Sequence, residues 1–387
     1  MTTFKVNVNK LNLRSSPVND FEDKSNVVGV LHQDTTFESA GEITNELGTW
    51  HSDRDGHWAS ENWLKNTSDI SLPLALIQAP AIIEFDEDKM SWAFSPGDGM
   101  DILSLWNNEN LLGQNVKIAV LDSGINTGIA DIMLAVEDKD HDLKSFIKDE
   151  SVEDDFGHGT SCASIICSQG TGLYGVSPKS KLIIGKIYSN AAGQTPEILL
   201  EALQWACEER AADIISMSFS FPYLKTEAND IPIAYKEVAD YIQRMAMLQN
   251  KLFLASIGNL GENAKEFNMF PANCPGCLSI GAFGHDRLTW SGSGWNTNIS
   301  FIAPGVDLKG YNLQSKKIVL QAATSFSCPF AAGTLANLLS YFKSKNISYS
   351  LSEFISKLIF DPPPMDNSLQ SGKGILNPIK TLKNLQL

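Results

Sequence analysis

Short apolar runs alternate with amphipathic stretches throughout residues 106–387, and this alternation constrains the fold more than any other feature. The spacing of apolar positions predicts helices over residues 195–209 and 233–249. Apolar strands separated by helices are typical of a parallel sheet covered on both faces. We therefore expect an α/β domain in which helices flank a parallel sheet. The expected strands are residues 116–121, 182–187, 214–219, 252–257, 278–283 and 299–303.

The first 105 residues follow a different pattern. Residues 1–65 consist of short alternating segments divided by turn residues, and they predict a small all-β barrel. Residues 66–105 mix prolines, acidic residues and apolar residues without a steady period, so we expect a linker or strap there. The predicted organisation is therefore a barrel, a linker, and an α/β domain over residues 106–387.

The charge of the chain narrows the classes of partner. The net charge is -15 and the pI is about 4.8, which argues against binding to nucleic acid or to an anionic membrane surface. No apolar run approaches the length of a membrane span, and the N-terminal residues lack the apolar segment of a secretory signal. We therefore expect a cytoplasmic protein with no nucleic acid and no membrane as partners.

Cysteines and acidic residues raise the question of metals. The cysteines lie in apolar or small-residue surroundings, which favours buried thiols in a reducing compartment over disulfides. Cys274 and Cys277 form a single CxxC pair, which is weak support for zinc. Acidic residues concentrate between positions 131 and 155, as on a solvated surface, without the ordered spacing of a calcium loop. We expect no required cofactor; calcium stays possible, with its site unassigned.

Four polar side chains lie where function gathers in such a sheet, near the carboxyl ends of strands. Asp122 directly follows an apolar run, and Asn259 closely follows another. His158 stands between two glycines at an expected helix start, and Ser325 begins the helix predicted for residues 321–342. Each has an ordinary structural explanation when taken alone, as a turn residue, a loop histidine or a helix cap.

Together these side chains would make up one reaction centre. Ser325 would attack a carbonyl carbon after His158 takes its proton, because a serine hydroxyl is a weak nucleophile without an adjacent base. Asp122 would hold the imidazole in the required tautomer. The Asn259 amide and the Ser325 backbone N–H would bind the oxyanion.

The local sequences carry a family resemblance. The segments VLDSG at 120–124, GHGTSCAS at 157–164, MSFS at 217–220, SIGN at 256–259 and TSFSCPFAAG at 324–333 resemble the subtilisin-like serine peptidases, or subtilases. The likeness extends over about residues 88–387 and includes the Asp, His, Ser order of subtilisin. It implies a serine endopeptidase that hydrolyses peptide bonds through an acyl-enzyme.

The resemblance also implies substrate contacts. The backbone of Ser218, Phe219 and Ser220 would pair with a peptide substrate as an added strand. Ser256, Ile257 and Gly258 would line the pocket for the side chain before the scissile bond, with an apolar preference. Three positions depart from the family pattern in small ways: Ala323 replaces a glycine, Ser161 a histidine, and Ser327 an alanine.

The N-terminal segment has a looser resemblance. LNLRSSP at 11–17, VVGVL at 27–31, GHW at 56–58 and WL at 63–64 are similar to the bacterial SH3 domain pattern. That resemblance implies an SH3-like domain that docks a protein or peptide partner. A folding aid or a lid is the alternative, and residues 66–105 could inhibit the enzyme by lying in its cleft.

Other readings of the catalytic centre stay open. A transpeptidase or macrocyclase would use the same acyl-enzyme and transfer it to an amine instead of water. A non-catalytic binding protein on the same fold would also retain these motifs. Asp154 and Asp155 could recognise basic side chains of a substrate beside His158. Cys162 and Cys328 could make the protein sensitive to thiol reagents, although a role as small buried packing residues is the simpler explanation for both.

Overall fold

The computed structural model describes residues 85–225, 231–312, 316–362 and 368–386, together with eight strands between residues 2 and 66. The chain separates into two compact units, Met1–Glu84 and Phe85–Leu387. Of the expected linker at residues 66–105, residues 67–84 lie outside the described part, and residues 85–105 belong to the larger unit.

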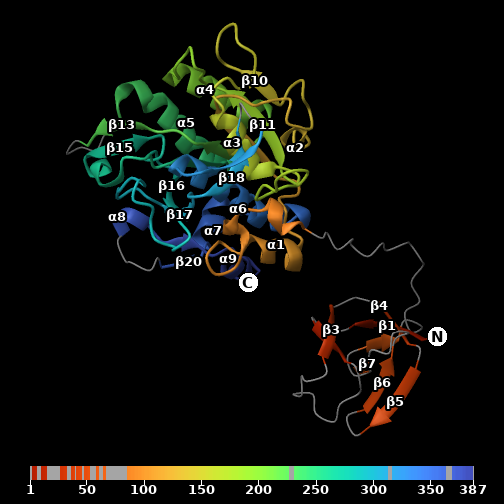
Figure 1. Ribbon diagram of the computed structural model, residues 1–387. Helices are drawn as coiled ribbons and strands as arrows, with labels where there is room; N and C mark the ends of the chain where they lie inside the picture. Colours follow the sequence, from red (N-terminus) through yellow and green to blue (C-terminus); the bar gives the residue numbers. More distant parts are fainter. Residues whose placement is uncertain are drawn as a thin grey trace. The chain divides into compact units, whose positions relative to one another are not determined.

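The described part of the smaller unit consists of antiparallel strands. They form two sheets, in the orders β4-β1-β8 and β3-β2-β7-β6-β5 (Figure 1). Their bounds are β1 Thr2–Val6, β2 Lys10–Arg14, β3 Val27–His32, β4 Thr36–Ser39, β5 Gly41–Asn45, β6 Gly48–Ser52, β7 Trp58–Ser60 and β8 Leu64–Asn66. Alternating apolar and turn residues thus form strands as expected, while the SH3-like barrel stays a prediction.

A mostly parallel sheet forms the centre of the larger unit, as the apolar runs predict. Its strand order is β10-β11-β9-β12-β14-β16-β17-β21-β20, and β20 alone in this sheet pairs antiparallel, with β21. The strands are β9 Lys117–Asp122, β10 Leu143–Ser145, β11 Lys181–Lys186, β12 Ile214–Met217, β14 Leu252–Ser256, β16 Cys277–Phe283, β17 Phe301–Pro304, β20 Phe360–Asp361 and β21 Ile375–Leu376.

Helices surround this sheet (Figure 1). They are α1 Ile102–Glu109, α2 Ala130–Met133, α3 His158–Cys167, α4 Pro196–Gln204, α5 Ile233–Gln249, α6 Thr324–Ser344, α7 Leu351–Ser356, α8 Ser368–Ser371 and α9 Pro378–Leu385. A short π-helical turn, residues 205–209, extends α4, so the helix expected at 195–209 is realised in two parts. None of the helices in the described part of the chain has both the length and the apolar character needed to cross a bilayer.

Helix α6 is the main structural support of the core. It contacts β12, β14, β16 and β17 as well as α3, and its residues 327–340 are all buried. A helix that is buried all round must be apolar or small on every face, which explains the run of alanine, glycine and leucine after residue 330. Gly333 is one such position, because a Cβ there would lie 2.8 Å from the Val176 Cβ.

Residues 85–101 pack on the larger unit and do not form a free linker. The Phe85 ring lies 4.7 Å from the ring of Trp106, and the Trp92 indole N–H donates to the Val306 carbonyl at 3.0 Å. Lys89 donates through its ammonium group to the Gly170 carbonyl at 3.2 Å. Large aromatic side chains bury much apolar area, so they anchor a segment that has no regular period.

A buried carboxylate organises the turn at residues 169–173. Asp131 is 3% exposed, and its side chain accepts hydrogen bonds from the backbone N–H groups of residues 169, 171, 172 and 173 at 2.9–3.2 Å. The Tyr311 hydroxyl donates to the same carboxylate at 2.8 Å. These donors offset the cost of burying the charge, so Asp131 joins α2 to this turn and to the strand β18 Leu308–Tyr311.

The Asp131→Asn variant should lose about 2–4 kcal/mol of unfolding free energy, because its amide group faces N–H donors that then lack an acceptor. Urea denaturation measures this loss. Asp140→Asn, at an exposed site, is the matched control and should stay within about 0.5 kcal/mol of the parent. Equal stabilities of the two variants would contradict the structural role given to Asp131.

Candidate active site

The four expected catalytic side chains lie on segments that meet at the carboxyl edge of the sheet. Asp122 is the last residue of β9, His158 the first of α3, Asn259 follows β14, and Ser325 lies in the first turn of α6. Glycine allows the closest of these approaches, because a Cβ on Gly159 would lie 2.4 Å from the carbonyl oxygen of residue 124 and 3.1 Å from the Asp122 Cβ. Gly159 therefore has a steric function, and Gly157 has φ +98°, in the region that favours glycine.

Asp122 and His158 form a direct pair. The Nδ1 atom of His158 lies 2.8 Å from Oδ1 and 3.0 Å from Oδ2 of Asp122, whose side chain is 1% exposed. The carboxylate only accepts, so Nδ1 carries the proton and Nε2 is the basic nitrogen. Burial lowers the pKa of His158, but the charge of Asp122 and the contacts with Asp122 and Cys162 together outweigh burial, so the pKa rises well above its usual value.

Asp154 has a structural role in the site that the sequence did not reveal. Its carboxylate accepts from the Ser123 hydroxyl at 2.8 Å, the Gly157 N–H at 2.7 Å, and the Thr160 N–H and hydroxyl at 2.9 and 2.6 Å. It also accepts from the N–H of residue 156 at 3.1 Å. Asp154 thus ties the end of β9 to the start of α3. An acid just before a helix start was the available signal.

These contacts argue against the idea that Asp154 and Asp155 are free to recognise basic side chains of a partner. Asp154 is only 7% exposed, and its carboxylate already accepts hydrogen bonds from groups of this protein, such as the Ser123 hydroxyl and the Thr160 N–H. Asp155 pairs with the buried Lys186 ammonium at 3.1 Å and accepts from the Asn190 N–H at 3.0 Å. Glu150 pairs with the same ammonium at 2.9 Å. Much of the acidic stretch is therefore engaged by protein donors.

The orientation of the Asn259 amide is determined by its neighbour. Thr324 donates its backbone N–H and its hydroxyl to the Asn259 Oδ1 at 3.0 and 2.9 Å. A backbone N–H only donates, so the atom facing it is the amide oxygen and the Nδ2 group is left to donate elsewhere. Asn259 is exposed, and the Ser325 N–H lies in the first turn of α6, where N–H groups lack helical partners.

Cys162 connects the histidine to the serine. Its Sγ atom lies 3.8 Å from the His158 Nδ1 and 3.5 Å from the Ser325 carbonyl oxygen. The ring of Phe326 lies 5.8 Å from that of His158. These contacts bring the Ser325 backbone close to the imidazole. Within the described residues, no hydrogen bond joins the Ser325 hydroxyl to the His158 ring. Catalytic hydrogen bonds often tighten only when substrate binds.

The cysteines near the site are buried. Cys162 and Cys328 are both 0% exposed, and burial raises the pKa of each thiol, that of Cys328 to about 12. They therefore stay protonated and act as small packing residues. All cysteines of the chain are free, which agrees with the expectation of thiols.

The three departures from the family pattern are accommodated. Ala323 has φ -175°, which is extended backbone open to any residue, so its Cβ causes no strain. Ser161 donates to the Tyr311 carbonyl at 2.7 Å, and Ser327 donates to the Thr324 carbonyl at 2.9 Å. Both hydroxyls are thus satisfied inside the protein.

Only part of the expected substrate-binding set is accessible. Phe219 and Ser220 are partly exposed, whereas Ser218, Ser256 and Ile257 are 3%, 1% and 0% exposed. Those three could therefore reach a substrate only through their main chain, and an apolar preference would rest on Phe219 alone.

Gly258 is a position that requires glycine. Its φ is +89°, and a Cβ there would lie 2.4 Å from the Met269 Cε. A side chain at residue 258 would be strained in conformation as well as crowded.

Tyr188 is a further neighbour of the pair that the sequence did not reveal. Its hydroxyl donates to the Asp122 Oδ1 at 2.8 Å and lies 3.2 Å from the His158 Nδ1. Tyr188 directly follows the strand expected at residues 182–187, and this position at a strand end was the only signal in the sequence that it could lie near the site.

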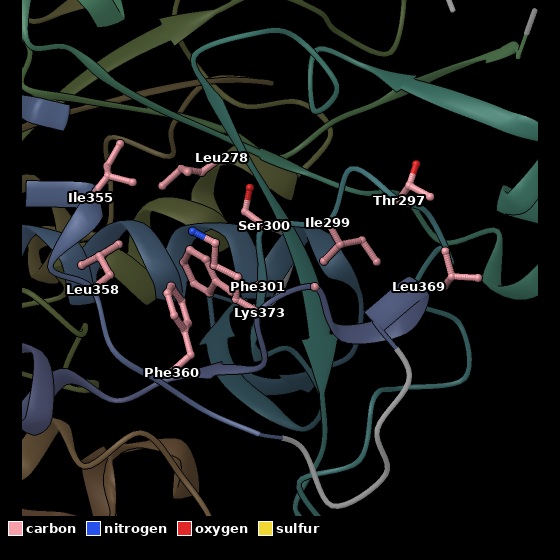
Figure 2. Close-up of a pocket in the computed structure, with 11 residues that line it drawn as sticks. Leu278, Thr297, Ile299, Ser300, Phe301, Ile355, Leu358, Phe360, Leu369 and Lys373 are labelled. Carbon is pink, nitrogen blue, oxygen red and sulfur yellow. The ribbon is translucent and has the colours of Figure 1, made fainter. Parts of the chain in front are cut away.

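The one group of potential metal ligands found among the described residues is Asp122, His158 and Cys162. These are the hydrogen-bonded side chains already described. A separate cavity of about 440 Å³ shares no residue with this site. Figure 2 shows its largely apolar lining from β16, β17, β20 and α7; among the described lining residues, Lys373 alone is charged.

Comparisons with known proteins agree with this geometry. Residues 113–359 match the family profile described as the subtilase family. The major intracellular serine protease of Bacillus subtilis (strain 168) is 30% identical over 263 residues, covering 66% of this chain and 78% of that protein. The intracellular serine protease of Paenibacillus polymyxa is 27% identical over 288 residues, covering 70% and 81%.

Solved structures share the fold. The prenylagaramide maturation protease PagA superposes with a TM-score of 0.61 at 22% identity, over 75% of this chain and 99% of that one. MycP1 without its N-terminal propeptide gives a TM-score of 0.59 at 18% identity, over 75% and 97%. With the sequence matches, these findings show that the chain belongs to the subtilase family and is a subtilisin-like serine endopeptidase.

Proposed function

We propose that this endopeptidase cleaves peptide bonds with Ser325 as nucleophile, His158 as general base and Asp122 as the carboxylate that holds the imidazole. The observation that carries the proposal is the bond of 2.8 Å between the His158 Nδ1 and the buried Asp122, on a ring adjacent to the Ser325 backbone. With its Nδ1 proton held by Asp122, the ring takes the hydroxyl proton through Nε2 as Oγ attacks the carbonyl carbon.

The oxyanion that forms would be bound by two N–H donors. One is the Ser325 backbone N–H in the first turn of α6, where the helix dipole also favours negative charge. The other is the Asn259 Nδ2 group, whose orientation is fixed by the two hydrogen bonds from Thr324. Collapse of the tetrahedral intermediate expels the amine, which takes its proton from His158, and water then hydrolyses the acyl-enzyme.

Ser325→Ala should abolish covalent labelling by a fluorophosphonate probe, because the probe forms its bond to the activated serine oxygen with loss of fluoride. Labelling is read as a mass increase on the intact protein. Ser327→Ala is the matched control, since the Ser327 hydroxyl donates to the Thr324 carbonyl and has no part in the proposed reaction, and this variant should be labelled like the parent.

An unlabelled parent protein would contradict the proposal and favour a binding role for the fold. Product mass tests the outcome of the acyl-enzyme. Peptide cleavage adds one water to the summed products, and a product that lacks this water would show capture by an amine instead of hydrolysis.

Asn259→Ala should lower kcat about 10²–10³-fold with little change in KM, because the lost donor acts mainly on the developing oxyanion. Thr324→Val keeps the N–H but removes the hydroxyl that orients Asn259, so it should cost only about threefold to tenfold. Steady-state kinetics on a peptide chosen from a substrate library measures both. A larger loss in Thr324→Val than in Asn259→Ala would contradict these roles.

We propose further that the N-terminal unit docks a protein target, in line with its SH3-like resemblance. Its described strands form an antiparallel assembly and form a compact unit of their own over residues 1–84. Two relatives are called intracellular proteases, and this chain has only free cysteines, so we propose that it acts in a reducing compartment on protein or peptide substrates.

Removal of residues 1–84 should leave the rate of fluorophosphonate labelling within about twofold while fewer proteins of a cell lysate are cleaved, because docking adds affinity without touching the chemistry. The cut ends before Phe85, whose ring contacts Trp106 and Tyr174, so the larger unit keeps its anchor. Faster labelling of the shortened protein would instead indicate inhibition by the removed segment.

A further inference from the structure

The path of the chain after β11 brings Tyr188 to the Asp122–His158 pair. The register of β11 and β9 sets Lys186 beside Asp122, and the Ile187 N–H donates to the Asp122 carbonyl at 2.8 Å. The next residue is Tyr188, whose partly buried ring meets the ring of Phe156 edge-on at 5.9 Å between centroids. Strand pairing and an aromatic contact therefore hold the tyrosine in place from two sides.

Its hydroxyl acts on the carboxylate directly. The Tyr188 oxygen lies 2.8 Å from the Asp122 Oδ1, which also accepts the Ser123 N–H at 2.8 Å and faces the His158 Nδ1 at 2.8 Å. A phenol has one proton to donate, and a carboxylate only accepts, so this proton points to Asp122. Burial raises the pKa of Tyr188 well above its usual value, and the hydroxyl therefore remains a donor throughout the working pH range.

We propose that Tyr188 is a positioning residue of this endopeptidase: its hydroxyl fixes the rotation of the Asp122 carboxylate and withdraws part of its negative charge from His158. This inference rests on the proposed catalytic roles of Asp122 and His158. It adds a hydrogen bond that sets the pH above which the base is active.

The direction of the effect follows from the charges around the ring. His158 is faced by Asp122 from β9, by Cys162 from α3 and by Tyr188 from the segment after β11. The carboxylate of Asp154 accepts from the N–H of Gly157, the residue before the histidine. Of these, the Cys162 thiol and the phenol are neutral, so Asp122 is the main charge that stabilises the imidazolium. Removing the phenolic donor strengthens the pull of the carboxylate on the His158 proton.

The base form of His158 then exists only at higher pH. General-base catalysis needs the neutral ring, so activity falls as pH drops through the pKa of His158. Tyr188→Phe should therefore move the acidic limb of the profile to higher pH. A purely structural role would lower the rate at every pH and leave the limb where it is.

The test compares the second-order rate of fluorophosphonate inactivation across about pH 5–10 for the parent, Tyr188→Phe and Tyr311→Phe. Tyr188→Phe should shift the limb upward by about half a pH unit and lower the plateau no more than about tenfold. Tyr311→Phe is the matched control, since Tyr311 also donates to a buried carboxylate, Asp131, at 2.8 Å. It should lose stability and keep the parent limb.

A second measurement does not depend on turnover. In Ser325→Ala, with and without Tyr188→Phe, proton NMR of the His158 ring should show a higher midpoint for the variant that lacks the phenolic hydroxyl. If Tyr188→Phe does not fold, Tyr188→Met keeps an apolar side chain of similar reach and should give the same shift. An unchanged or lowered midpoint with a normally labelled parent overturns the role of Tyr188, whereas an unlabelled parent overturns the catalytic proposal itself.

Discussion

The proposed catalytic geometry depends on one buried carboxylate to which we assign no chemical step. Asp154 accepts five hydrogen bonds, one from the Ser123 hydroxyl at the end of β9 and four from the segment that begins α3. The strand and the helix carry the two members of the acid–base pair, and neither is near the other in sequence. Removing the Asp154 carboxylate would leave several buried donors without acceptors, so its structural role is to hold the end of β9 against the start of α3.

The hydrogen bonds around the pair form two layers. In the first layer, Asp122 accepts hydrogen bonds from the Ser123 N–H and from the Tyr188 hydroxyl. In the second, the Ser123 hydroxyl donates to Asp154 and accepts from the Gly159 N–H at 2.9 Å. On the opposite side, Thr324 orients Asn259. Asp122 and Asn259 are thus both held in orientation by hydrogen bonds from neighbouring residues. This limits how far their side chains must move when charge develops in the transition state.

The sequence predicted the part of this arrangement that depends on local pattern. The apolar runs predicted the parallel sheet because buried strands need continuous apolar residues, and four side chains could be selected because strand ends gather at one edge. Tyr188 and Asp154 could not be selected in this way. Their roles depend on β11 lying next to β9 and on a loop folding under α3, and strand order is not written in local periodicity. Residues 85–101 were expected in a linker because their aromatic anchors have no regular spacing. That Ala323 can replace a glycine without strain depends on a backbone angle, φ -175°, that only the fold determines.

The burial of α6 has a consequence for inactivation by heat. The serine lies at the start of the helix that contacts four central strands, and residues 327–340 are buried. Segments of this kind open only when the whole domain opens, whereas exposed turns fray at much lower free energy. Cleavage of surface loops should therefore not disrupt the proposed reaction centre at once. Loss of proteolytic activity on warming should follow unfolding of the whole domain rather than an early local opening.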